Sequence, residues 1–122
     1  MKLDHINVVT DHLDETTAFF VDVIGLEVGF RPNFKFNGAW LYGDKDIPAI
    51  VHLVERTPDG DSTGPLDHVA FKAEDIDGLK GRLDRHNLPY EVRVIPGTGD
   101  RQVFFDAPFG LRIEVNFPPD AM

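Results

Sequence analysis

A repeat at half the chain length is the feature that most limits what this sequence can fold into. Leu3-Asp4-His5 returns as Leu66-Asp67-His68, and each copy opens an apolar run that favours a β-strand. The separation is 68 − 5 = 63 residues in a chain of 122. A period this long, present only twice, indicates a duplicated module, because a solenoid needs at least about three repeats. We expect the two copies to pack symmetrically and to bring the two histidines together.

The repeat extends beyond the opening triplet. Residues 10–14 align with residues 73–77 at the same offset of 63, and residues 50–53 align with 112–115 at 114 − 52 = 62. The offset between the two copies changes by one residue, which a single difference in loop length explains. The 122 residues favour one domain, 1–122, made of a first module at 1–57, a linker at 58–65 rich in Pro, Gly and Asp, and a second module at 66–118.

Hydrophobic periodicity predicts one strand, one helix and three further strands in each half, and therefore an α+β fold. Asp11 or Asp14 is expected to cap the first helix, Gly25 to end it, and Asp75 to start the second at 76–86. The strands are predicted at 2–10, 26–30, 39–42 and 49–54, then at 67–73, 90–95, 102–106 and 111–117. The apolar stripe of the first helix is predicted at Leu13, Thr17, Phe20, Val21 and Ile24.

Composition excludes several classes of partner. Twelve basic and 21 acidic residues give a net charge of −9, which disfavours nucleic acid and anionic membrane surfaces. The chain has no cysteine, so any metal must be held by His, Asp or Glu. No apolar segment follows Met1, and no uncharged run is long enough to span a bilayer. We expect a soluble, cytoplasmic protein with a small-molecule partner.

Four residues with metal-binding side chains occupy equivalent places in the two halves. His5 and His68 lie on the first predicted strands, and His52 and Glu114 on the last. Strand alternation places each on the less apolar face, so all four are expected to face one cavity. Imidazole and carboxylate are ligands for Zn, Ni, Fe and Mn. Each residue alone is better explained as a partly buried, hydrogen-bonded strand residue, but the set at equivalent positions favours a metal site.

The order of these features resembles the vicinal oxygen chelate superfamily, which includes glyoxalase I, bleomycin and fosfomycin resistance proteins, methylmalonyl-CoA epimerase and extradiol dioxygenases. The resemblance covers Leu3 to Phe117. It rests on four stretches, namely Leu3 to Ile6, Phe19 to Leu26, Asp67 to Phe71 and Pro108 to Glu114. The fold that it implies is a pair of βαβββ modules whose strands curve into an incompletely closed, mixed β-barrel with the helices outside.

Carried over to this chain, the family's ligand positions fall on His5, His52, His68 and Glu114. His52 departs from the family, because the glyoxalase I pattern has Glu there and the epimerase pattern has Gln. The resemblance implies an enzyme dependent on a divalent metal such as Zn, Ni, Mn or Fe, which stabilises an oxyanion on a small oxygenated substrate. In this interpretation Glu114 alternates between ligand and general base, and His52 assists proton transfer.

A lyase or isomerase is the favoured reaction class. One alternative is an Fe(II) dioxygenase of the extradiol type, against which four protein ligands argue, because they leave fewer positions for dioxygen and substrate. Another is a non-catalytic binder that resembles the bleomycin resistance proteins. The resemblance implies a homodimer, because many relatives of this size dimerise, and some of them place the site between subunits by pairing modules of different chains.

Four further residues are candidates for binding the substrate. Asn7 points the same way as His5, and Trp40 and Tyr42 share one strand face. Arg101 follows a Gly-rich turn and could bind an anionic group. The alternatives are that Trp40 belongs to the core and that Arg101 is a surface residue paired with a carboxylate.

Overall fold

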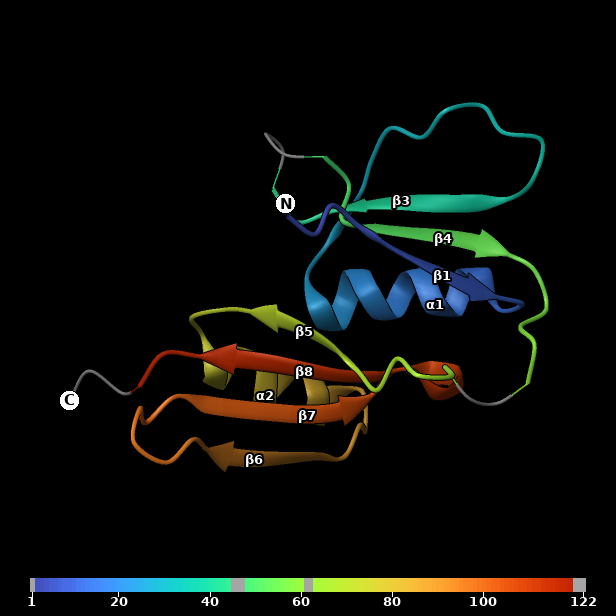
Figure 1. The fold of residues 1–122 in the computed structure, drawn as a ribbon. Helices are drawn as coiled ribbons and strands as arrows, with labels where there is room; N and C mark the ends of the chain where they lie inside the picture. Colours follow the sequence, from blue (N-terminus) through green and yellow to red (C-terminus); the bar gives the residue numbers. More distant parts are fainter. Residues whose placement is uncertain (1, 45–47, 61–62, 120–122) are drawn as a thin grey trace. The chain divides into compact units, whose positions relative to one another are not determined.

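The computed structural model describes residues 2–44, 48–60 and 63–119. Residues 61–62 of the predicted linker lie outside the described residues. The chain divides into two compact units, Met1–Asp61 and Ser62–Met122. Each unit has one strand, one helical segment and three further strands in that order (Figure 1). The predicted α+β class and the two βαβββ modules are confirmed.

Both units form an open four-stranded sheet with the same topology. In each sheet the first strand runs parallel to the last, the remaining neighbours are antiparallel, and the orders are β1-β4-β3-β2 and β5-β8-β7-β6. The first unit contains β1 (Ile6–Thr10), α1 (Leu13–Phe19), a π-helix (Phe20–Ile24), β2 (Glu27–Val28), β3 (Gly38–Tyr42) and β4 (Val51–Glu55). The second contains β5 (Val69–Lys72), α2 (Ile76–Arg85), β6 (Tyr90–Val94), β7 (Arg101–Asp106), a 3-10 turn (Pro108–Gly110) and β8 (Arg112–Phe117).

One face of each sheet is buried, and the other carries the predicted site residues. On β4, Val51 and Leu53 are fully buried while His52 between them is half-buried. On β8, Ile113 and Val115 likewise flank Glu114. α1 contacts β4, and α2 lies behind β7 and β8 in Figure 1. Alternation along a central strand therefore assigns one phase to the core and the other to the site.

The first helix differs from its prediction in cap and in buried face. His12, and not Asp11 or Asp14, is the N-cap residue, and its backbone N–H donates to the Thr10 hydroxyl at 3.0 Å. The helix widens into a π-helix after Phe19, and the Gly25 N–H donates to the Phe20 carbonyl at 3.0 Å. The buried residues are Thr16, Phe19, Phe20 and Val23 in place of the predicted stripe, of which only Phe20 is retained. They recur at spacings of three and four, as the predicted residues do, so the buried face is offset by about one residue from the start of α1.

The other two predicted helix boundaries, the end at Gly25 and the start at Asp75, are confirmed. Gly25 ends the first helical segment in the left-handed conformation, with φ of 92°. The Asp75 carboxylate caps α2 by accepting a hydrogen bond from the Gly78 N–H at 2.9 Å. β2 is shorter than predicted, with two residues in place of the expected five.

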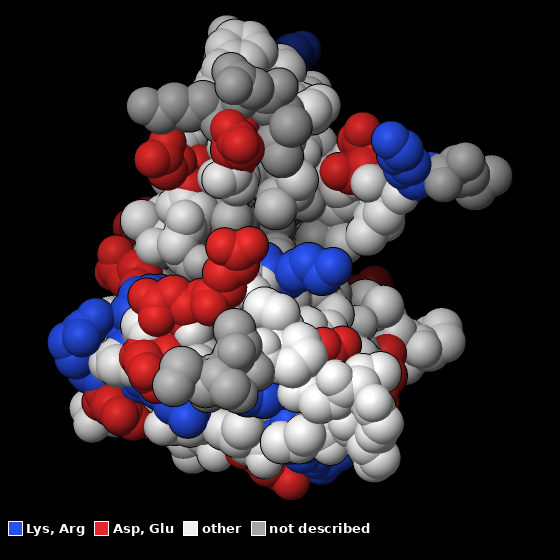
Figure 2. Space-filling view, turned by 90° about the vertical axis from the view of Figure 1, so that its left-hand side faces the viewer, with Lys and Arg blue, Asp and Glu red and all other residues white. Residues whose placement is uncertain are grey.

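The described surface agrees with the acidic composition. Figure 2 shows Asp and Glu side chains spread over the face in view, with Lys and Arg in separate groups among them. No helix among the described residues is long and apolar enough to cross a bilayer.

Candidate functional site

In the first unit three predicted site residues form a stack of rings. Strand register places Asn7 of β1 and Trp40 of β3 on either side of His52 of β4. The Trp40 and His52 rings are stacked, with centroids 4.0 Å apart and planes 5° apart. His5 covers the other face of His52, with centroids 3.9 Å apart and planes 18° apart. The His52 imidazole therefore lies between two aromatic rings, and the half-buried Trp40 belongs to the site face of the sheet.

The stack continues into the loop between β2 and β3. Phe34 lies 6.2 Å from Trp40 between ring centroids and 5.1 Å from Phe36. The Arg31 guanidinium carbon is 5.0 Å and 5.1 Å from the two Phe centroids, and its Nη2 donates to the Phe36 carbonyl at 2.8 Å. Both Phe rings remain exposed, at 42% and 47%. Tyr42, the other predicted ring of β3, donates its hydroxyl to the Phe30 carbonyl at 2.6 Å.

In the second unit the two predicted ligands are also adjacent. β5 runs parallel to β8, and His68 Nε2 lies 3.3 Å from Glu114 Oε1. Glu114 is buried, at 7% exposure. Removing a carboxylate from water is costly unless it is paired with a positive group or coordinates a metal. A buried carboxylate whose recorded partner is one imidazole therefore fits a cation at this place.

His5 and His68, which directly precede β1 and β5, are each held by the residue before them. His5 Nδ1 lies 2.6 Å from the Asp4 carboxylate, and His68 Nδ1 lies 2.8 Å from the Asp67 carboxylate. An ionised carboxylate only accepts hydrogen bonds, so Nδ1 carries the proton and Nε2 keeps its lone pair for a ligand. The sequence contained this signal in the repeated triplet, although no role was predicted for either aspartate.

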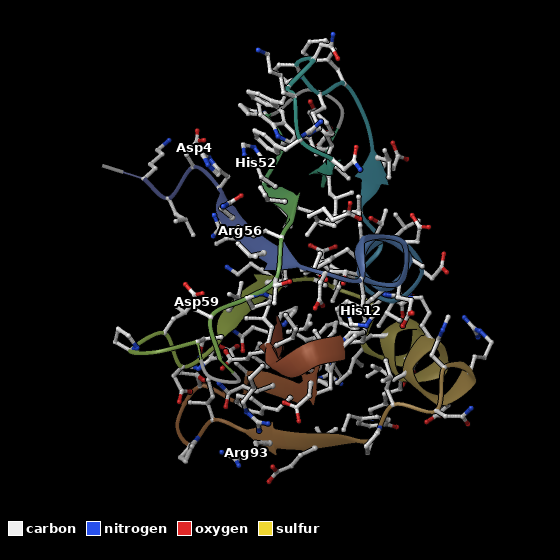
Figure 3. The ribbon with its side chains drawn as sticks, turned by 90° about the vertical axis from the view of Figure 1, so that its right-hand side faces the viewer. Asp4, His12, His52, Arg56, Asp59 and Arg93 are labelled. Carbon is white, nitrogen blue, oxygen red and sulfur yellow. The ribbon has the colours of Figure 1, made fainter. Side chains whose placement is uncertain are left out.

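An aspartate before a histidine is not by itself a sign of a metal site. His12 Nδ1 makes the same contact with the Asp11 carboxylate, at 2.6 Å. Figure 3 labels Asp4 and His52 close together in the first unit, whereas His12 lies beyond the opposite end of β1. His12 therefore provides an internal comparison for His5.

Sequence reasoning missed a cluster around Phe104. This ring lies opposite Glu114 in the register of β7 and β8, and 6.4 Å from the His68 ring between centroids. The guanidinium carbons of Arg93 and Arg112 lie 4.9 Å and 5.3 Å from its centroid. Strand alternation places Phe104 on the site face, but no role was predicted for it from the sequence.

Arg101 is not brought to the Glu114 pair. It lies opposite Phe117, which is one residue out of phase with Glu114. Its Nη2 donates to the Pro118 carbonyl at 3.3 Å. The suggested role of Arg101 in binding an anionic group stays a prediction without support from this placement.

Partial burial of His52 changes its acid–base behaviour. The pKa of His52 is lowered from the ordinary value of 6.5, first by loss of hydration and second by the neighbouring His5, while Asp4 acts in the opposite direction. A lowered pKa means that the unfolded chain takes up a proton before the folded chain does as the pH falls. The neutral imidazole is therefore the favoured form in the stack.

For metal-free protein we expect the free energy of unfolding to decrease as the pH falls from 6.5 toward the lowered pKa of His52. Below that pKa both states are protonated, and this contribution stays constant. Urea unfolding at about pH 7.5 and about pH 5, followed by circular dichroism, measures the effect. His52→Gln should show a smaller pH dependence than the wild type, and an identical dependence would contradict the assignment.

The structure brings the predicted ligands together in two pairs, His5 with His52 and His68 with Glu114. Within the described residues no group of three or more His, Asp and Glu side chains is placed to hold a metal ion. The donor types, three imidazoles and one carboxylate, are those that divalent transition metals accept.

Comparison with known proteins agrees with the fold. The family model described as Glyoxalase/Bleomycin resistance protein/Dioxygenase superfamily matches residues 2–115. Glyoxylase I 4 of Arabidopsis thaliana is 31% identical over 93% of this chain and 69% of that protein. The uncharacterized protein YaeR of Escherichia coli K12 is 28% identical over 93% of this chain and 94% of that protein.

Two solved structures illustrate the likeness of the fold. A putative glyoxalase family protein from Bacillus anthracis superposes with a TM-score of 0.76 at 22% identity, over 97% of this chain and 95% of that one. A mutant of the fosfomycin resistance protein FosX from Listeria monocytogenes, in complex with Mn(II) and 1S,2S-dihydroxypropylphosphonic acid, superposes with a TM-score of 0.75 at 16% identity. That match covers 98% of this chain and 93% of the other.

Proposed function

Because the chain belongs to the Glyoxalase/Bleomycin resistance protein/Dioxygenase superfamily, we propose that it is a divalent-metal-dependent enzyme acting on a small oxygenated substrate. The observation that carries the proposal is the buried Glu114 carboxylate beside His68 Nε2, at 3.3 Å. A cation would satisfy that carboxylate, and the Asp67 contact directs the lone pair of His68 toward the same place.

The proposed ligands are His5, His68 and Glu114, and His52 was predicted as a fourth. His5 and His68 share the arrangement in which Nδ1 is bound by a carboxylate and Nε2 is free for a metal. The chemistry that a divalent ion would supply there is Lewis acidity, which stabilises an oxyanion by several kcal/mol. Mn(II) is present in the FosX structure, and Zn, Ni and Fe accept the same donors.

The chain's own residues then have distinct roles in a lyase or isomerase reaction. Glu114 is the proposed general base, because it is the buried carboxylate on the site face and can accept a proton from the substrate. The neutral form of His52, favoured by its lowered pKa, can accept a proton as well. Asn7 and Trp40, which flank His52, are proposed to contact the substrate. The expected homodimer stays a prediction.

A second candidate function, an Fe(II) dioxygenase, is favoured by one observation. His5 and His52 are stacked nearly parallel, so only one of them is oriented to bind a given ion. Two histidines and one carboxylate are the ligand set of many non-haem iron oxygenases, which keep positions open for substrate and dioxygen.

Elemental analysis of protein purified without chelators tests the proposal. We expect about one equivalent of divalent metal per chain, as a single site of this type would bind. Zinc, nickel or manganese would support the lyase or isomerase, and iron would support the dioxygenase. A protein that contains no metal, and binds none of these ions when they are added, would contradict an enzyme of either kind and favour a binding protein.

A further inference from the structure

On the site face of the first sheet, the His52 ring lies enclosed between the rings of Trp40 and His5. We infer that His52 is a positioning residue. Its ring stacks on the His5 imidazole and holds it in place for the metal, and His52 is not a ligand of the same ion. We call this role of His52 the plate. This inference rests on the proposed function, because it concerns the ligands of the proposed metal site.

The ring geometry excludes joint coordination by the two histidines in this arrangement. The lone pair of an imidazole nitrogen lies in the plane of its ring, and the bond to a metal is about 2.1 Å long. The His5 and His52 planes are inclined by only 18° at a centroid distance of 3.9 Å. Planes so nearly parallel meet far beyond the reach of such a bond. The two imidazoles are therefore not oriented to donate their lone pairs to one ion, and His5 and His52 would not hold the same metal together.

Of the two rings, His5 is the one prepared to bind. Its Nδ1 is held by Asp4 at 2.6 Å, as the Nδ1 of its repeat partner His68 is held by Asp67. The hydrogen bonds of the described residues include no such carboxylate partner for the His52 ring. Ligand histidines usually have their second nitrogen fixed in this way.

His52 is instead held by its two faces. Trp40 lies parallel to one face at 4.0 Å and 5°, and His5 lies against the other. The backbone pairing of β3 with β4 places Trp40 directly opposite His52, so the plate is fixed by the sheet itself. His5 precedes β1 and is exposed, and the stack supplies the restraint that the strand does not give it.

Two substitutions of His52 distinguish a role as a stacking plate from a role as a metal ligand. His52→Phe keeps a flat ring between Trp40 and His5 but has no donor atom, whereas His52→Gln keeps donor atoms and loses the ring. Both are compared with the wild type and with His5→Ala in metal-free protein titrated with Co²⁺ alone, by calorimetry and by the visible absorption of the bound ion. The emission of Trp40, the single tryptophan, reports the stack before metal is added. Far-UV circular dichroism and urea midpoints establish that each variant is folded.

If His52 acts as a plate, the Co²⁺ dissociation constant of His52→Phe should lie within about threefold of the wild-type value, with the same absorption spectrum. His52→Gln should bind Co²⁺ about 10–100-fold more weakly. The Trp40 emission should shift to the red in His52→Gln only. Two outcomes would contradict the plate and show that His52 is a ligand. In one, His52→Gln binds Co²⁺ as the wild type does while His52→Phe loses affinity. In the other, both variants lose as much Co²⁺ affinity as His5→Ala. A wild-type protein that binds no Co²⁺ would overturn the proposed function, and the plate's role in metal binding with it.

Discussion

Replacing His5 or Glu114 with alanine is expected to remove nearly all metal from the purified protein. Each substitution deletes a proposed ligand, and His5→Ala also removes one face of the stack around His52. Loss of an outer-shell partner alone costs about 10–100-fold in metal affinity, so loss of a ligand should exceed about 100-fold. Metal content by elemental analysis and the dissociation constant of Zn²⁺ by calorimetry provide the measurement.

The matched control for this experiment is His12→Ala. His12 makes the same contact with a preceding aspartate, at 2.6 Å, but lies at the start of α1 and outside the proposed ligand set. Its metal content should equal that of the wild type. Unchanged metal stoichiometry in both His5→Ala and Glu114→Ala would remove the proposed site, and an equal loss in His12→Ala would show that the effect is not specific to the ligands.

The sheet face on which each site residue lies was predictable, because it depends on repetition and on strand alternation, whereas the choice of neighbouring strands was found in the structure. Parallel pairing of the first and last strands places His68 near Glu114, and the same pairing places His5 near His52. Alternation then fixes the sheet face on which each residue lies. These two rules require no knowledge of side-chain torsion angles.

The stack of His5, His52 and Trp40 was not predictable by the same rules. Alternation assigns a face to each residue, but ring stacking depends on the side-chain rotamers, and many combinations share one face. The sequence accordingly assigned His5 and His52 to one metal, whereas their parallel planes argue against shared coordination. Phe104 was missed for a related reason, since neither hydrophobicity nor alternation reveals that two guanidinium groups lie over its ring.

The position of Arg101 shows that a shift of one residue along a strand decides which face of the sheet a side chain occupies. Its place after a Gly-rich turn suggested an exposed cation near the site, but β7 begins at Arg101 itself, and its register partner is Phe117. A shift of one residue along a strand moves a side chain to the opposite face. In the first helix, a difference of one residue likewise separates the predicted Thr17 and Ile24 from the buried Thr16 and Val23.

The largest stability effect is expected from Leu53→Ala. Leu53 is fully buried on β4, directly after His52, and points to the opposite face of the sheet. Truncating a buried leucine removes its contacts and leaves a cavity, at a cost of about 2–5 kcal/mol in the free energy of unfolding. Since proteins of this kind are stable by about 5–15 kcal/mol, a large fraction of the stability should disappear. Urea unfolding followed by circular dichroism measures the loss.

Val94→Ala on β6 is the comparison, because Val94 is 61% exposed and its truncation should change the free energy of unfolding by less than about 0.5 kcal/mol. Leu53→Ala should still bind metal under conditions in which it is folded, because the substitution leaves the site face of β4 intact. A loss no larger than that of Val94→Ala would contradict the burial of Leu53. A folded Leu53→Ala protein with weakened metal binding would show that the core face also positions His52, since the two residues are adjacent on one strand.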